Sequence, residues 1–155
     1  MDKFGEMVKA LSEELAAMDA LRGELTSLRK APYPGVYRAQ GSVLHDFYTA
    51  CERIFLRIAK DIDGDVPQGE HWHIELIKRM ASERGDIRPE VISEDLARAL
   101  RPYLGFRHVF RNIYGYELHP DRLRPLIERF DETFDGFQEE IQRFMVFLKQ
   151  VLDEL

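Results

Sequence analysis

Cysteine is almost absent from this sequence of 155 residues. The single Cys51 excludes a disulfide within the chain, and its place in an apolar helical pattern predicts a small buried side chain. No apolar run approaches the roughly 20 residues that a membrane span requires. The first residues, Met1, Asp2 and Lys3, lead into an amphipathic segment instead of an apolar secretion signal. These absences predict a protein of a reducing, cytoplasmic compartment with no membrane anchor.

An excess of positive charge is also lacking, since 28 Asp and Glu outnumber 22 Lys and Arg and the net charge is −6. Bulk electrostatics will therefore not attract the whole molecule to nucleic acid. One stretch departs from this balance, because no acidic residue lies between Asp95 and Glu117. That stretch contains a group of basic side chains: Arg98, Arg101, Arg107, His108 and Arg111. The pattern indicates a local stripe that binds an anion.

What the sequence does contain is typical of a folded globular chain, with 45% hydrophobic and 32% charged residues. Ten Phe and six Tyr supply a sizeable core. The length fits one domain over residues 1–155. We find no internal repeat and no segment of low complexity.

Apolar residues recur at helical spacing in five segments. The expected helices cover residues 3–29, 42–62, 72–82, 94–113 and 120 to the C-terminus. Ser42 and Ser93 are expected N-caps, and Pro102 is expected to kink or break the fourth helix. No segment alternates with a period of two. The predicted fold class is all-α, a bundle of about five helices.

The fourth segment carries the chemistry, in the stretch Phe106-Arg-His-Val-Phe-Arg-Asn-Ile-Tyr-Gly-Tyr. At 100° per residue its polar residues gather on one face and its apolar residues on the other. The polar set comprises Arg107, His108, Arg111, Asn112 and Tyr114. Guanidinium groups bind phosphate bidentately, and an imidazole transfers protons near neutral pH.

Such a set suits cleavage of RNA without a metal or cofactor. RNA carries its own nucleophile, an arginine stabilises the charge of the transition state, and a histidine acts as acid or base. On this interpretation the guanidinium groups of Arg101, Arg107 and Arg111 bind RNA phosphates, and His108 transfers the proton. The residues alone leave another interpretation open, a solvated basic helix face with a tyrosine packed at its edge.

The same residues resemble the motif of HepT-like toxins of the HEPN superfamily, which is Arg, four residues, His, one residue and Tyr. Here Arg107 is followed by Asn112 at the place of the His and by Tyr114 at the place of the Tyr.

The resemblance to the family extends over roughly residues 41–152. Within this region three segments match in the same order as in the family: residues 48–60, 69–81 and 103–112. Residues 1–30, the first helix, add little to it.

The resemblance implies homodimeric helical bundles in which two motif helices form a composite cleft that cleaves RNA. It also implies a minimal nucleotidyltransferase antitoxin as partner, which modifies the motif tyrosine with AMP. Carried over to this sequence, Arg107 would be the catalytic arginine that binds the phosphate, with His108 and Asn112 as the other catalytic candidates. Arg101 and Arg111 would bind RNA, and Tyr114 would be the modified residue. The catalytic histidine has no counterpart.

Asn112 therefore leaves two interpretations. An amide cannot transfer protons, and loss of a general acid–base costs about 10²–10⁴ in rate. Either His108, one turn earlier on the helix, substitutes for the histidine, or the chain no longer cuts and only binds RNA or the nucleotidyltransferase. A third interpretation is a helical protein unrelated to RNA whose basic face docks an acidic protein.

Two further groups of residues are expected to have structural roles. Glu52 and Arg53 match an acid–base pair of the family and are candidates for holding the motif helix. His71 and His73 flank Trp72 at a helix start, where capping and packing are a better account than metal binding, because no further ligands lie near in sequence.

Overall fold

The computed structural model describes residues 3–30, 35–112 and 118–154. Its helices are α1 (Lys3–Lys30), α2 (Val36–Ile58), α3 (Trp72–Met80), α4 (Glu94–Arg111) and α5 (Pro120–Glu154), with a short π-helical turn, η1 (Ala59–Asp63), after α2. Within the described ranges there is no strand, only an isolated bridge between Arg84 and Arg88. The predicted all-α bundle of five helices is confirmed.

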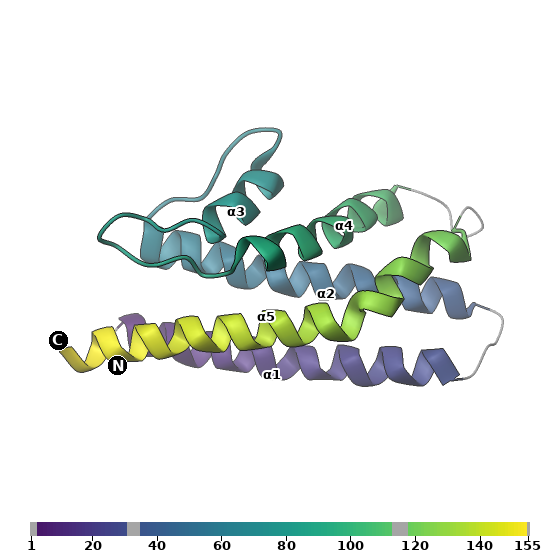
Figure 1. The fold of residues 1–155 in the computed structure, drawn as a ribbon, viewed down its shortest axis with the longest axis horizontal. Helices are drawn as coiled ribbons and strands as arrows, with labels where there is room; N and C mark the ends of the chain where they lie inside the picture. The colour runs from purple at the N-terminus through teal and green to yellow at the C-terminus, as the bar shows by residue number, and fades with distance from the viewer. Residues whose placement is uncertain (1–2, 31–34, 113–117, 155) are drawn as a thin grey trace.

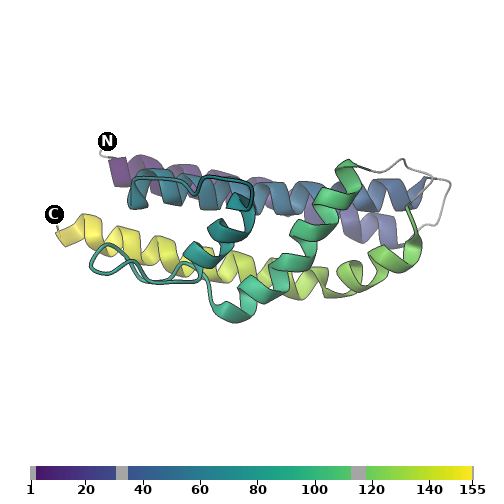
Figure 2. The ribbon, with the colours of Figure 1, turned by 90° about the horizontal axis from the view of Figure 1, so that it is seen from above.

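Three long helices, α1, α2 and α5, run side by side, and α3 and α4 cover one side of them (Figure 1). Seen from above, α4 runs obliquely across α2 and α5 (Figure 2). The chain begins and ends at the same end of the bundle, whereas α4 finishes toward the opposite end.

Helix α2 is the centre of the bundle, since α1, α3, α4 and α5 all pack on it. Its buried residues are spread around the helix and include polar as well as apolar side chains: Val36, Gln40, Gly41, Val43, Leu44, Phe47, Tyr48, Cys51, Glu52, Ile54, Phe55 and Ile58. A helix that is buried on most of its circumference contributes to a core instead of a surface layer. The predicted burial of Cys51 is confirmed.

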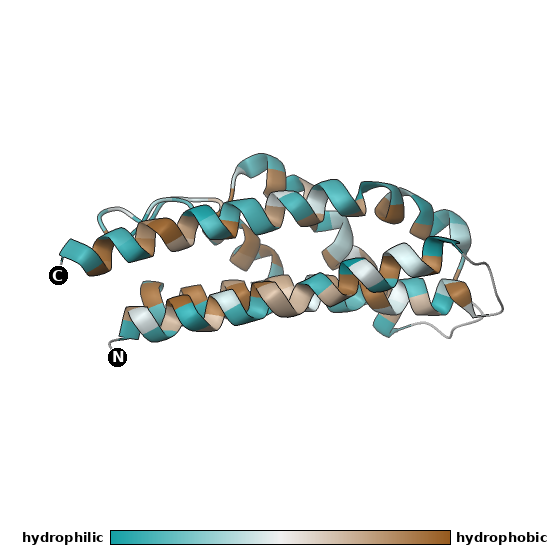
Figure 3. Cartoon of the chain, turned by 90° about the horizontal axis from the view of Figure 1, so that it is seen from below, coloured by the Kyte–Doolittle hydropathy of each residue, from teal (hydrophilic) through white to brown (hydrophobic). Residues whose placement is uncertain are grey.

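The outer helices are amphipathic, and Figure 3 shows hydrophilic and apolar patches alternating along α1 and α5. Helix α1 buries one narrow stripe of five apolar residues. Polar contacts to α5 accompany this stripe: Arg29 pairs with Asp131 at 3.1 Å and donates to the Ile127 carbonyl at 2.6 Å. The side-chain amide of Gln138 donates to the Leu15 carbonyl at 3.1 Å. No described helix is both long enough and apolar enough to cross a membrane.

The start of α2 was predicted wrongly. The helix begins at Val36, six residues before the expected cap Ser42. Gly35 precedes it with φ of 89°, a left-handed conformation that glycine adopts at no steric cost. The early turns then pack tightly on α4, since a Cβ at Gly41 would lie 3.2 Å from Phe110. Tertiary contact, which local sequence does not reveal, extends the helix.

Helix α4 starts as predicted, and of the kink or break expected at Pro102 the break does not occur. The Ser93 hydroxyl accepts a hydrogen bond from the Leu96 amide at 3.1 Å, which confirms the cap. Pro102 lies inside a helix that is continuous from Glu94 to Arg111. Proline removes one backbone donor, but buried residues on both sides of it, Leu100 and Tyr103, hold the two halves of the helix on the core.

The segment between α3 and α4 is fixed by a buried ion pair. Arg88 binds Asp63 of η1 bidentately, at 2.7 Å from Nε and 2.9 Å from Nη2, and both side chains are 0% exposed. Its remaining donors bind the carbonyls of Ser82, Pro89 and Arg79. This pair connects the end of α2 to the approach of α4.

Candidate functional site

Helix α4 has one inward and one outward row of residues. Leu96, Leu100, Tyr103 and Arg107 follow each other at intervals of four, three and four residues and are all buried. The outward row contains the other basic and polar residues that were predicted as site residues: Arg101, His108, Arg111 and Asn112. The structure therefore separates Arg107 from the rest of the predicted set.

The guanidinium of Arg107 is turned into the bundle. Its Nη2 lies 2.9 Å from both carboxylate oxygens of Glu52 on α2, and the side chains are 3% and 9% exposed. Nη1 lies 3.4 Å from the Thr49 hydroxyl, and the guanidinium carbon lies 5.0 Å from the centre of the Tyr48 ring. Within the single chain the Arg107 guanidinium therefore faces a carboxylate and not an open groove. A carboxylate that is itself buried requires a charged partner, and Arg107 is that partner.

A histidine from α3 completes this buried cluster. Nδ1 of His73 lies 2.7 Å from Glu52 and 3.3 Å from Nη2 of Arg107. We assign the Nδ1 proton to the shorter contact, so that His73 donates to the carboxylate. The centre of the His73 ring lies 3.6 Å from that of Trp72, with the two planes tilted by 31°, and the His73 side chain is 32% exposed. Three helices thus meet at Glu52.

The sequence indicated part of this cluster. Glu52 does hold the motif helix, as expected, whereas its neighbour Arg53 is exposed and pairs with Glu14 of α1 at 3.2 Å. For His73 the sequence predicts only capping and packing, and it does not predict the contact with Glu52. The inward direction of Arg107 had a local signal, because it continues the apolar row of Leu100 and Tyr103.

Burial keeps the neighbouring acidic groups protonated. It raises the pKa of the Tyr48 phenol and of the Cys51 thiol, with smaller contributions from their negative neighbours, while Arg107 opposes the shift. Among the described residues the Tyr48 hydroxyl has no hydrogen-bond partner. These groups are poor nucleophiles. The cluster around Arg107 is built to hold helices together.

At the end of α4 the outward residues have partners of their own. Nε of Arg111 donates to Nε2 of His45 at 2.9 Å, and Nδ1 of that ring lies 3.1 Å from Asp46. Asn112 ends the helix, since its side-chain amide donates to the His108 carbonyl at 2.7 Å. The Asn112 amide is thus a helix cap in this structure.

Arg101 and His108 are the outward residues with free polar groups. Both are exposed, and within the described ranges neither side chain makes a hydrogen bond or an ion pair. They are seven residues apart, so they lie on the same side of the helix. Tyr114, the predicted site of modification, lies outside the described residues.

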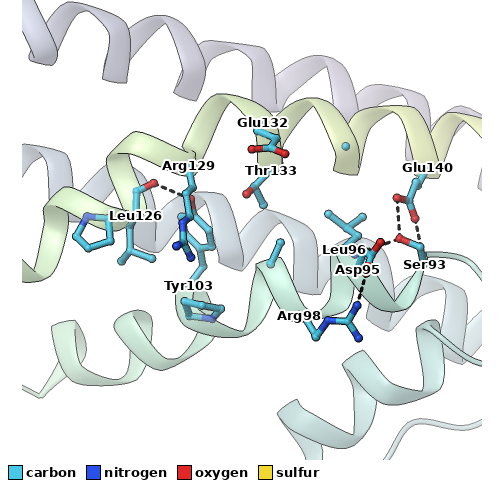
Figure 4. A pocket seen from close by; sticks show the side chains of 14 residues that line it. Ser93, Asp95, Leu96, Arg98, Tyr103, Leu126, Arg129, Glu132, Thr133 and Glu140 are labelled. Atoms are coloured by element: carbon cyan, nitrogen blue, oxygen red, sulfur yellow. Dashed lines mark hydrogen bonds and ion pairs between the residues drawn. The ribbon is translucent and has the colours of Figure 1, made fainter.

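A hollow of about 460 Å³ lies between α4 and α5 (Figure 4), and Arg107 is not among the residues that line it. Among its lining residues Arg98 binds Asp95, and the Glu140 carboxylate accepts a hydrogen bond from the Ser93 hydroxyl. The Tyr103 hydroxyl of α4 donates a hydrogen bond to the Leu126 carbonyl of α5 at 2.6 Å. This hollow contains none of the catalytic candidates. In the described part of the chain, no group of three or more His, Cys, Asp or Glu side chains is placed to hold a metal ion.

Fold and motif together define a helical bundle with an arginine-bearing motif helix of the HEPN type. The family model described as HepT-like protein matches residues 39–148, which is most of the chain. The chain belongs to the HepT-like family of the HEPN superfamily. Helix α1 lies outside the matched region. Neither a curated protein nor a solved structure matches the sequence.

Proposed function

We propose that this chain is a HepT-like protein of a toxin–antitoxin pair that binds RNA through the outward side of α4 and does not cleave it. The observation that carries the proposal is the buried pair of Arg107 and Glu52. The family assigns the phosphate to this arginine, and here its guanidinium is bound by a carboxylate of its own chain.

Recruiting Arg107 to a phosphate would mean breaking that pair. Separating a buried ion pair costs about 3–5 kcal/mol, because the carboxylate left behind has lost its partner. The proton transfer that the reaction requires has no donor at Asn112 either, since an amide does not exchange protons at neutral pH. His108 lies in the outward row and Arg107 in the inward row, so their side chains leave the helix on different sides.

The outward row retains what RNA binding requires. Arg101, His108 and Arg111 are presented from a helix without an acidic residue between Asp95 and Glu117. Contacts of this kind bind phosphates independently of base sequence and weaken with salt. In the family a minimal nucleotidyltransferase modifies the motif tyrosine, and we include such a partner, with Tyr114 as its target, and a homodimer in the proposal.

The second candidate is a metal-independent endoribonuclease, the usual toxin activity of the family. The observation in its favour is the exposed imidazole of His108, which lies three residues before Arg111 on the outward side. In that case Arg111, and not Arg107, would contact the phosphate, and His108 would transfer the proton.

RNA binding and cleavage can be measured on the same samples. A labelled single-stranded RNA is titrated with the full chain in the presence of EDTA, with fluorescence anisotropy for binding and gel electrophoresis for cleavage. We expect binding without cleavage. In the double variant Arg101→Ala with Arg111→Ala, the affinity for RNA should depend less steeply on salt concentration, by the amount that about one to two phosphate contacts contribute. Lys149→Ala, which removes an exposed charge at the far end of α5, is the matched control.

Three results would change the conclusion. Cleavage that disappears in His108→Ala and persists in Arg107→Met identifies the second candidate. Cleavage that is lost in Arg107→Met, while circular dichroism shows that the variant is folded, means that the buried pair opens and that the proposal is wrong. Absence of RNA binding at low salt rejects both candidates and favours docking of an acidic protein.

A further inference from the structure

A second hollow, of about 360 Å³, lies between α3 and α4 at the Arg101 end of the outward row. Its floor is apolar and comes from both helices: Ile74, Ile77, Ala81 and Ala97. Lys78, Arg98 and Arg101 stand at its rim, with a single carboxylate, Glu94. An apolar floor surrounded by cations suits a ligand that combines a flat apolar body with an anionic group.

The rim cations are available to a ligand. Arg101 has no hydrogen bond or ion pair within the described ranges, and it is exposed. Arg98 and Lys78 pair with Asp95 and Glu75 respectively, each one turn away on its own helix and largely exposed. Exposed pairs of this kind contribute only about 0–1 kcal/mol, so an incoming anion can replace the carboxylate at little cost.

We propose that this hollow holds one nucleotide of a bound single-stranded RNA, with the base on the apolar floor and its phosphate on Arg101. The inference rests on the proposed RNA binding, and it adds the place on the protein where one base of the RNA is held. The strand then follows α4 toward His108 and Arg111. Ten residues of helix separate Arg101 from Arg111, about 15 Å along the axis, which a strand with several phosphates can span and a single carboxylate cannot.

The apolar floor distinguishes this site from a general basic surface. Phosphate contacts alone bind any sugar–phosphate chain, whereas a floor made of Ile74, Ile77 and Ala97 contributes only when a base is present. Removing the base from the ligand should therefore weaken binding to the intact protein, and filling the hollow should abolish that difference.

The test compares a labelled RNA of about ten nucleotides with an abasic strand of the same length. Ala97→Leu fills the floor from α4, and Arg101→Gln removes the rim cation; Ala17→Leu on the exposed side of α1 is the matched control for the added bulk. We expect Ala97→Leu to weaken RNA binding about tenfold and to leave binding of the abasic strand unchanged. Arg101→Gln should weaken both. Thermal unfolding of each variant shows whether it is folded, and Arg101→Gln changes only an exposed side chain.

Other outcomes overturn the inference in distinguishable ways. RNA binding that depends on Arg111 but is unchanged in Ala97→Leu and Arg101→Gln rejects the nucleotide site and leaves the proposed function standing. Equal affinity for RNA and for the abasic strand rejects the floor as a base site. A hexaglutamate peptide that binds as tightly as RNA, with the same loss in Arg101→Gln, identifies an acidic protein as the ligand instead. Failure of the unaltered chain to bind any RNA rejects the proposed function together with the inference.

Discussion

Replacing Arg107 by alanine should destabilise this protein far more than replacing any outward arginine of the same helix. The change leaves the Glu52 carboxylate, 9% exposed, without its guanidinium. Breaking a buried ion pair by removing one partner costs about 3–5 kcal/mol. His73 stays 2.7 Å from the carboxylate, so we expect a loss near 3 kcal/mol for Arg107→Ala. Glu52→Ala should cost more, because Arg107 is the more buried partner.

The pair can be separated from simple packing by a double-mutant cycle. Urea unfolding followed by circular dichroism gives the free energy of unfolding for Arg107→Met, Glu52→Leu and the double variant, and urea does not screen charges as guanidinium salts do. Replacing both partners by apolar side chains of similar volume is often close to neutral. We therefore expect the double variant to be more stable than either single variant, with a coupling energy of about 2–3 kcal/mol.

Arg101→Ala is the matched control, since Arg101 lies on the same helix, is exposed and has no partner in the described part of the chain. It should change the free energy of unfolding by no more than about 0.5 kcal/mol. The reasoning fails if Arg107→Ala costs as little as Arg101→Ala. The guanidinium would then be free to turn outward, and a catalytic role for it would return.

Three further predictions concern other buried groups. Arg88→Lys should cost about 3 kcal/mol or more in urea unfolding, because a lysine cannot reproduce the two bonds to Asp63; a loss below 1 kcal/mol would mean that the pair is not required. Cys51, with burial raising its pKa, should react with a thiol reagent only as fast as the protein unfolds, and rapid reaction of the folded protein would contradict its burial. Burial raises the pKa of Tyr103 to about 12, above the value of about 10 in an unfolded chain. The contribution of the Tyr103 phenol to stability is therefore present below pH 10 and is lost as the pH rises through 12. Circular dichroism should show that Tyr103→Phe loses less stability at alkaline pH than the unaltered protein, and an equal loss would refute the raised pKa of Tyr103.

The helices were predictable because their causes are local. Apolar residues at intervals of three and four, together with a serine before the fourth helix, specify where a chain forms an amphipathic helix. The failures had non-local causes. The early start of α2 depends on close packing of Gly41 against Phe110, 69 positions later in the chain, and the continuity of α4 through Pro102 depends on residues buried on either side of it.

The candidate site was predictable in its composition and only partly in its arrangement. Helical periodicity placed His108, Arg111 and Asn112 correctly on the surface of α4, because angular positions on a helix follow from sequence spacing. The same helical periodicity also placed Arg107 on that polar face. Polarity alone suggested that a guanidinium faces solvent, although its spacing from Leu100 and Tyr103 already indicated the inward row.

By itself, the sequence determined an all-α chain, membership of the HepT-like family and a basic stripe without acids. Only the tertiary structure decided which partners Arg107 meets inside the bundle. A charge is buried when another element presents a buried countercharge, and Glu52 on α2 and His73 on α3 are brought to Arg107 by the packing of three helices. The spacing within α4 indicates that Arg107 points inward, but no pattern within one helix identifies those partners.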